Sequence, residues 1–219
     1  MFFVVYERTT DAVLKYDALA GIVMTLVDLK RNDEAIKYAE MYPDNIGLNK
    51  DTLMNWILTG EEKRRHSQQM LMNYFDGMLG VLCASDCPDP KNIEYLECAE
   101  RLIKTMFPSG EYTRYYDDLM DIAVYKALKY VYTDPQKSVE ELKKAREYAE
   151  IFDDLFMHKP TAIPYNSPYF DLLDYDSADL LVYGPLEANK RMDNFNWWLS
   201  ALQFDAIRER DDFQALLNK

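Results

Sequence analysis

Helical periodicity runs through almost the whole chain, and it limits the fold more than any other feature of the sequence. Between residues 13 and 29, apolar side chains return every three or four residues, on a face broad enough to pack between two neighbouring helices. The same spacing recurs within residues 71–82, 116–130 and 139–152. No segment shows sustained alternation of apolar and polar residues, so we expect little or no β-sheet. The pattern predicts an all-α fold.

Capping residues and prolines predict where the helices begin and end. Asp89-Pro90 and Asp134-Pro135 each offer an acidic N-cap followed by proline at the first helical position, where its missing N–H costs nothing. Thr59-Gly60-Glu61-Glu62 has the pattern of a capping box. We therefore expect helices near residues 11–30, 33–42, 51–58, 61–84, 90–107, 111–132, 135–157, 186–202 and 211–218.

A three-residue motif recurs at equivalent points of three expected helix pairs. It reads Tyr38-Ala39-Glu40, Cys98-Ala99-Glu100 and Tyr148-Ala149-Glu150, each time in the second helix of a pair. A small alanine at this point lets the neighbouring helix approach closely. Stacked pairs of this kind form a solenoid whose inner wall can bind a partner. The repeat predicts such a stack over residues 1–157, with residues 158–219 completing the same domain as a covering segment and capping helices.

The segment from Leu19 to Pro43 shows the repeat unit best. Its apolar positions, together with Ala35 and Ala39, resemble the tetratricopeptide helix-turn-helix pattern, and residues 30–35 look like the turn between its two helices. The usual tryptophan and glycine are absent, and the units are not regularly spaced by about 34 residues. We therefore expect a tetratricopeptide-like stack whose later pairs are more degenerate.

Longer motifs are similar to those of one known family. The segment from Lys37 to Leu71, with its YAE-x-x-P helix end and its GEEK sequence, resembles the middle of the C-terminal domain of Firmicute transcriptional regulators that carry a Cro/repressor-type helix-turn-helix. KKAREYAEIFDDL (residues 143–155) and FDAIRERDDFQALL (residues 204–217) resemble two further segments of that family, although Ala206 and Asp212 stand in place of its prolines. The resemblance implies a tetratricopeptide-like regulatory domain. It would bind a peptide, a protein segment or a second copy of itself.

The family's DNA-binding head has no counterpart before residue 11, which leaves two interpretations: a truncated regulator, or a free-standing relative that does not bind DNA. Asp and Glu number 38 against 25 Lys and Arg, so the net charge is −13 and repels phosphate backbones. We expect no direct nucleic-acid contact by this chain. The longest apolar stretch, residues 18–29, is too short to span a membrane, and the start of the chain does not read as a signal peptide. With an odd number of cysteines, three, a cytoplasmic protein is expected.

The sequence offers little enzyme chemistry. Nucleophile elbows, glycine-rich phosphate loops and metalloprotease helices are missing. Asp117, Asp118 and Asp121 could together hold a hard cation, but without EF-hand spacing a solvated acidic face is the better interpretation. Cys83 and Cys87 lack the second pair that a zinc site needs, so we interpret the thiols as buried or idle. We expect no catalytic residues, no metal and no cofactor.

Tyrosine is unusually frequent, at 17 residues. A phenol hydroxyl must be paired or wet, which suits the wall of a groove for a peptide or partner segment, but tyrosines also fill the spaces between helices. Both interpretations remain open. The groove hypothesis assigns Tyr74, Tyr112, Tyr116, Tyr125, Tyr165 and Tyr169 to the ligand or partner site.

Two C-terminal segments complete the predictions. Residues 157–184 carry three prolines at intervals of four with aromatic residues between them, so we expect them to cross the surface of the helical stack and bury those aromatics. Phe195, Trp197 and Trp198 are expected to cap the open end of the stack or to form an interface. The functional hypothesis is a non-enzymatic peptide- or protein-binding regulatory domain. Its alternative is a purely structural scaffold or a standalone adaptor.

Overall fold

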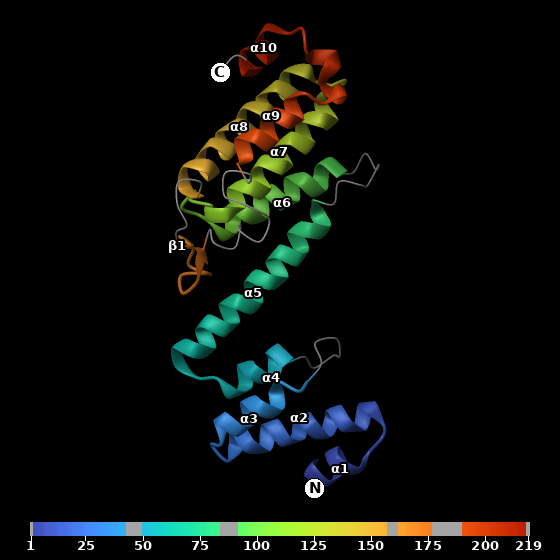
Figure 1. The fold of residues 1–219 in the computed structure, drawn as a ribbon, viewed down its shortest axis with the longest axis vertical. Helices are drawn as coiled ribbons and strands as arrows, with labels where there is room; N and C mark the ends of the chain where they lie inside the picture. The colour runs from blue at the N-terminus through green and yellow to red at the C-terminus, as the bar shows by residue number, and fades with distance from the viewer. Residues whose placement is uncertain (1, 43–49, 84–91, 157–161, 177–189, 218–219) are drawn as a thin grey trace. The chain divides into compact units, whose positions relative to one another are not determined.

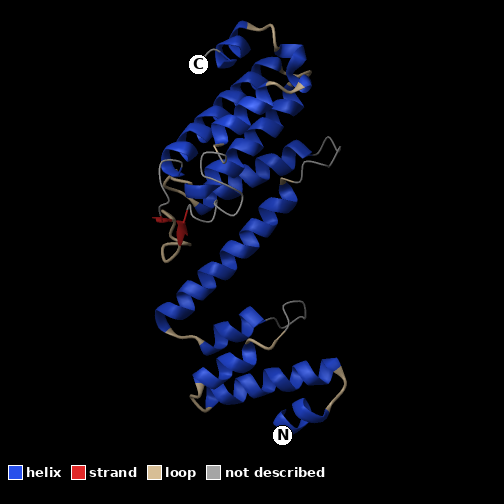
Figure 2. Cartoon of the chain, viewed as in Figure 1, coloured by secondary structure: helices blue, strands red, loops and turns tan. Residues whose placement is uncertain are grey.

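The computed structural model describes residues 2–42, 50–83, 92–156, 162–176 and 190–217. These residues are mostly helical, with one small antiparallel sheet, so the expected all-α class is confirmed at that level (Figure 2). The chain forms two compact units, Met1–Asn73 and Tyr74–Lys219. From sequence we expected a single domain in which residues 158–219 complete residues 1–157. The residues after 190 pack with helices that precede residue 157, within the second unit.

The first unit is built on a helix hairpin. Its elements are α1 (Phe2–Arg8), α2 (Ala12–Asp28), α3 (Asn32–Ala39), α4 (Lys50–Ile57) and the beginning of α5 (Gly60–Leu82). The Asp11 carboxylate caps α2 by accepting hydrogen bonds from the backbone N–H groups of Val13 and Leu14. Lys30 takes a left-handed conformation, with φ of 60°, where the chain turns from α2 into α3. The expected helix-turn-helix from Leu19 is therefore present.

The core of the first unit contains the apolar residues that the periodicity singled out. Side chains from α2, α3 and α4 meet there, namely Leu19, Ile22, Val23, Leu26, Ala35, Ala39, Tyr42, Leu53 and Ile57. Helix α1 was not expected from sequence. Its Phe2 ring packs over Gly21 of α2, where an added Cβ would lie 2.6 Å from ring carbons. Glycine at residue 21 therefore lets α1 lie against α2.

The second unit contains the end of α5 and the rest of the chain. Its further elements are α6 (Asn92–Met106), η1 (Thr113–Tyr115), α7 (Tyr116–Tyr130), α8 (Pro135–Phe156), β1 (Ala162–Pro164), β2 (Asp174–Asp176), α9 (Arg191–Leu199), η4 (Leu202–Ile207) and α10 (Asp211–Leu217). α7 and α8 form a helix hairpin, and α9 packs along both (Figure 1). The Asp134 carboxylate accepts a hydrogen bond from the Lys137 N–H at 3.1 Å, which confirms it as the N-cap of α8. The Asp89-Pro90 cap lies outside the described residues.

Two expected helices differ from the structure. The helix predicted over residues 111–132 is broken, because Gly110 and Thr113 both have positive φ, 81° and 50°, and the chain forms η1 before α7 begins. Of the helix predicted over residues 186–202, α9 occupies Arg191–Leu199. The separate 3-10 helix η4, which was not predicted, follows it.

Residues 162–176 cover one end of α6 and η1, as expected. β1 and β2 pair antiparallel, with Ile163 opposite Tyr175. Between them, Tyr165 and Phe170 are buried in contact with Phe107. The Ser167 hydroxyl donates a 2.6 Å hydrogen bond to the carbonyl of Met106, which fastens the segment to the end of α6. We call residues 162–176 the strap.

The repeated motif marks close helix contacts. Ala39, Ala99 and Ala149 are all completely buried, as expected for small residues where another helix approaches. Their neighbours differ, because Glu40 and Glu150 are exposed whereas Glu100 is partly buried and paired with lysines. Among the described helices, none has the length and apolar content needed to cross a bilayer.

Candidate functional site

The second unit contains a pocket of about 280 Å³ at the meeting point of four helical elements and the end of a fifth. Its apolar wall comes from α6, α7 and α9, and its polar edge from α7 and η4. Cys83, which directly follows α5, completes it. The lining residues are Cys83, Leu96, Tyr125, Leu128, Lys129, Trp198 and Gln203. We call this the α7 pocket, because α7 contributes the most residues to it.

An aromatic wall extends from inside the pocket to the surface. The Tyr125 and Trp198 rings meet edge to face, with centroids 5.8 Å apart, and Trp198 contacts Trp197 at 4.9 Å. Trp197 is 63% exposed, and Leu202, which precedes the lining residue Gln203, is 79% exposed. Large apolar side chains therefore lie in water next to a partly apolar pocket, an arrangement typical of surfaces that bind a partner.

Two carboxylates continue the pocket face along α7. Asp118, Asp121 and Tyr125 follow one another at intervals of three and four residues, which places them on one side of the helix. Burial and, to a smaller extent, the charges of Asp118 and Asp121 together raise the pKa of the Cys83 thiol to about 12. Because both charges act on this thiol, the carboxylates lie on the side of α7 that bears the pocket.

Partial burial keeps these carboxylates from being an ordinary solvated face, which corrects the expectation from sequence. Burial and the neighbouring charge of Asp117 raise the pKa of Asp118 and of Asp121 to about 7. Asp117 differs, because its carboxylate forms a 2.5 Å ion pair with Nε of Arg191. Within the described part of the chain, no side chain forms an ion pair or a hydrogen bond with Asp118 or Asp121.

The cation closest in sequence to Asp118 is engaged elsewhere. Arg114 forms an ion pair with Asp76 of α5 and stacks on the Tyr115 ring, 4.5 Å from its centroid. The Tyr115 hydroxyl donates a 2.8 Å hydrogen bond to the same Asp76 carboxylate. This arrangement satisfies Asp76 and leaves negative charge on the pocket face of α7.

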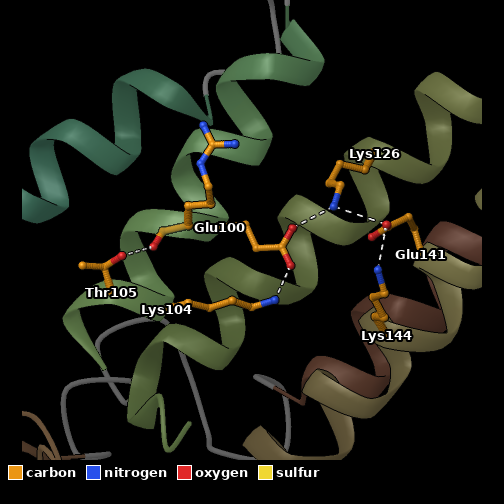
Figure 3. A network of polar contacts seen from close by, with 7 residues as sticks. Glu100, Lys104, Thr105, Lys126, Glu141 and Lys144 are labelled. Carbon is orange, nitrogen blue, oxygen red and sulfur yellow. Dashed lines mark hydrogen bonds and ion pairs between the residues drawn. The ribbon is translucent and has the colours of Figure 1, made fainter. Parts of the chain in front are cut away.

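A buried ionic network connects α6, α7 and α8 (Figure 3). The Lys126 ammonium, on a residue only 5% exposed, bonds to Glu100 of α6 at 2.7 Å and to Glu141 of α8 at 3.2 Å. Lys104 and Lys144 pair with the outer sides of these two carboxylates. Burial alone would raise the pKa of Glu100, but the hydrogen bonds from Lys104 and Lys126 lower it to about 2. The network therefore stays charged and connects α6, α7 and α8.

The structure does not bring the six predicted tyrosines together. Only Tyr125 lines the α7 pocket. Tyr112 and Tyr116 contact each other with centroids 5.3 Å apart, Tyr165 is a buried residue of the strap, and Tyr74 and Tyr169 are exposed. Tyr165 thus fills space between elements, and a role in a ligand groove stays a prediction for Tyr125.

The three residues predicted to cap the stack or to form an interface also lie in different environments. Phe195 is fully buried in the core with Leu199, whereas Trp197 is exposed and Trp198 lines the pocket. Phe195 therefore belongs to the helical core, and the two tryptophans belong to the surface around the pocket.

Several pocket residues were not predicted from sequence. The spacing of Asp118, Asp121, Tyr125 and Leu128 could have shown that they share a face of one helix. Nothing local could have placed Cys83, Leu96 or Gln203 beside that face, because tertiary packing brings them from other elements.

Comparisons with known proteins do not identify a family for this chain. In the described residues, no group of three or more His, Cys, Asp or Glu side chains is placed to hold a metal ion. No family model matches the chain, and no curated protein and no solved structure matches it.

Proposed function

We propose that this chain is a non-enzymatic, tetratricopeptide-like regulatory domain that binds a peptide or a protein segment in the α7 pocket. The proposal covers a cytoplasmic protein that makes no direct contact with nucleic acid, in agreement with its net charge of −13. The observation that carries it is the aromatic wall of Tyr125 and Trp198, which continues into exposed Trp197.

The lining of the pocket suits a side chain presented by another polypeptide. Leu96, Leu128 and the two rings offer apolar contact, while Lys129 and Gln203 at the edge can bond to backbone groups of the ligand. Tyrosine and tryptophan are frequent at protein interfaces, because each combines a large apolar surface with a polar atom. A volume of about 280 Å³ fits one or two side chains, as expected for a ligand that otherwise lies along the surface.

A ligand here can act on the arrangement of helices. The residues that line the pocket come from several elements, so an occupant that binds one arrangement of these elements more tightly shifts the population toward it. In a regulator related to the Firmicute family, such a shift would be passed on to a DNA-binding head. The burial of the strap residues Tyr165 and Phe170 against Phe107 favours the alternative, a purely structural role, for that part of the unit.

Fluorescence of Trp198 can test the proposal directly. The chain has three tryptophans, so the double variant Trp56→Phe/Trp197→Phe leaves Trp198 as the sole indole. We would titrate nonapeptides of glycine and serine into this variant. Each peptide carries at its centre a leucine, a phenylalanine or another aromatic residue that is not tryptophan. We expect saturable changes in Trp198 emission, which the added substitution Leu128→Lys removes because it places a charge in the pocket.

The matched control is Tyr132→Ala, which removes a large side chain that is 80% exposed and does not line the pocket. Binding in this variant should equal that of the parent. Equal binding by the Leu128→Lys variant would contradict the proposal, as would the absence of a response to every peptide. Light scattering over a range of concentrations would show in the same samples whether the chain forms a homodimer.

A further inference from the structure

We infer that the α7 pocket selects a segment in which a basic residue lies close to an apolar side chain, so that the apolar group enters the pocket and the cation meets Asp118 and Asp121. This inference rests on the proposed function and names the chemistry of the partner. Its basis is the juxtaposition, on one face of α7, of an apolar pocket and two carboxylates with which no described side chain forms an ion pair or a hydrogen bond. Arg114 and Arg191 lower the pKa values of Asp118 and Asp121, respectively, only through their charge.

Charge complementarity favours a cationic ligand over a neutral or acidic one. A partly buried carboxylate without a partner is costly, and a cation brought by a ligand removes that cost. The chain as a whole carries 13 excess negative charges, which attract a basic segment at long range. An acidic segment would add like charge beside Asp118 and Asp121 and would be repelled.

Helix geometry sets the spacing of the two groups in the ligand. Asp121 and Tyr125 are four residues apart, which corresponds to about 6 Å along the helix axis at a rise of ~1.5 Å per residue. An extended peptide covers about 6–7 Å in two residues. The basic residue should therefore lie two positions from the apolar anchor in an extended ligand, or about four positions away in a helical one.

On the other side of Tyr125 from the two carboxylates, Lys129 restricts which charges the ligand can carry. It lines the pocket one turn beyond Tyr125, and its side chain is exposed. The face of α7 is thus negative before Tyr125 and positive after it. A second basic residue, on the other side of the apolar anchor, would lie near Lys129 and be repelled. A ligand with basic residues on both sides should therefore gain less affinity than one with a single basic residue facing Asp118 and Asp121.

Binding of the cation should depend on pH, because it requires ionised carboxylates. Asp117, Asp118 and Asp121 on α7 are faced by Asp76 of α5, Cys83, Arg114 of η1 and Arg191 of α9. Since the pKa values of Asp118 and Asp121 are about 7, most of each is ionised at pH 8 and little at pH 6. Affinity for a cationic ligand should fall as the pH falls through 7.

The test uses three matched nonapeptides, each acetylated and amidated. They have the sequence GSGRSLGSG, the same sequence with citrulline in place of arginine, and the same sequence with glutamate there. Citrulline keeps the shape of arginine and removes its charge. In calorimetry or Trp198 fluorescence at pH 8 and low salt, we expect the arginine peptide to bind at least about fivefold more tightly than the citrulline peptide, with the glutamate peptide weakest. At pH 6 the advantage of arginine should shrink.

Variants of the carboxylates separate this inference from the proposed function. Asp118→Asn/Asp121→Asn should abolish the preference for arginine and its pH dependence while leaving the citrulline peptide bound. Asp154→Asn, which changes an exposed carboxylate of α8 outside the pocket, should preserve both. Equal binding of the arginine and citrulline peptides by the parent would overturn the inference and leave the proposed function standing. If no peptide of any charge binds, the proposed function itself fails.

Discussion

At the scale of single residues, the charged groups inside the second unit do two different things. Lys126 is buried between Glu100 and Glu141, and all three keep their charges because each has a partner of opposite sign. Asp118 and Asp121 are partly buried without such a partner, and their pKa values rise to about 7 as a result. Asp118 and Asp121 thus differ from the paired charges of the Lys126 network, and titratable groups with strongly shifted pKa values are typical of functional sites.

The paired group gives the first stability prediction. Lys126→Met leaves Glu100 and Glu141 facing each other across a buried site without their shared cation. We expect the free energy of unfolding to fall by about 3–5 kcal/mol, measured by urea denaturation.

The matched control is Lys104→Met, which removes a more exposed lysine from the same network. Its cost should stay below about 1 kcal/mol, because an exposed ion pair contributes little. Equal losses for the two variants would show that Lys126 behaves as a surface lysine.

At the scale of elements, the strap holds through its aromatic contacts. Phe170 is completely buried and meets Phe75, Phe107 and Tyr165, whereas its neighbour Tyr169 is 45% exposed. The strap therefore joins the end of α6 to α5 within the second unit, although it contains hardly any regular secondary structure.

Phe170→Ala should release the strap from its cluster. Loss of a buried phenylalanine costs about 3–5 kcal/mol, and hydrogen exchange should accelerate first in residues 162–176. Tyr169→Ala serves as the control and should change the free energy of unfolding by less than about 1 kcal/mol. A uniform acceleration of exchange throughout the unit would indicate that the strap is not a separate element of stability.

Element positions were largely predictable from the sequence, because apolar spacing and caps are local signals. Asp134 caps α8 as expected, and the apolar stripe of α2 forms a core. The break before α7 was not predictable, since a β-branched residue such as Thr113 seldom adopts positive φ and gives no sign of it. α1 was missed because its seven residues are too few for a periodic pattern.

At the scale of the whole molecule, each of the two units has a hydrophobic core of its own. Each core draws only on residues of its own unit, so a cavity in one should weaken that unit first. The α7 pocket was harder to predict than these cores, because tertiary packing brings its lining residues together. Cys83 and Leu96, for example, lie about a hundred residues or more before Trp198 in the sequence. From sequence, Tyr125 was assigned to a ligand groove and Trp198 to the end cap or an interface, whereas in the structure both rings belong to one wall of the pocket.

Single-tryptophan variants can follow the two units separately, with Trp56 reporting on the first and Trp198 on the second. Ile22→Ala should lower the urea midpoint reported by Trp56 by the equivalent of about 2–5 kcal/mol and leave the midpoint reported by Trp198 unchanged. Leu142→Ala, equally buried but in the second core, should do the reverse. Coincident shifts at both tryptophans would mean that the units unfold as one.

The ion pair between Arg114 and Asp76 has a consequence for regulation. Asp76 holds the Arg114 guanidinium in an ion pair, so Arg114 acts on Asp118, four positions further along the chain, through its charge and not through an ion pair of its own. The charge of the pocket face therefore depends in part on an acidic side chain that does not line the pocket. Neutralising Asp76 would free Arg114 to turn toward Asp118, and the protein's own arginine would then compete with any basic guest.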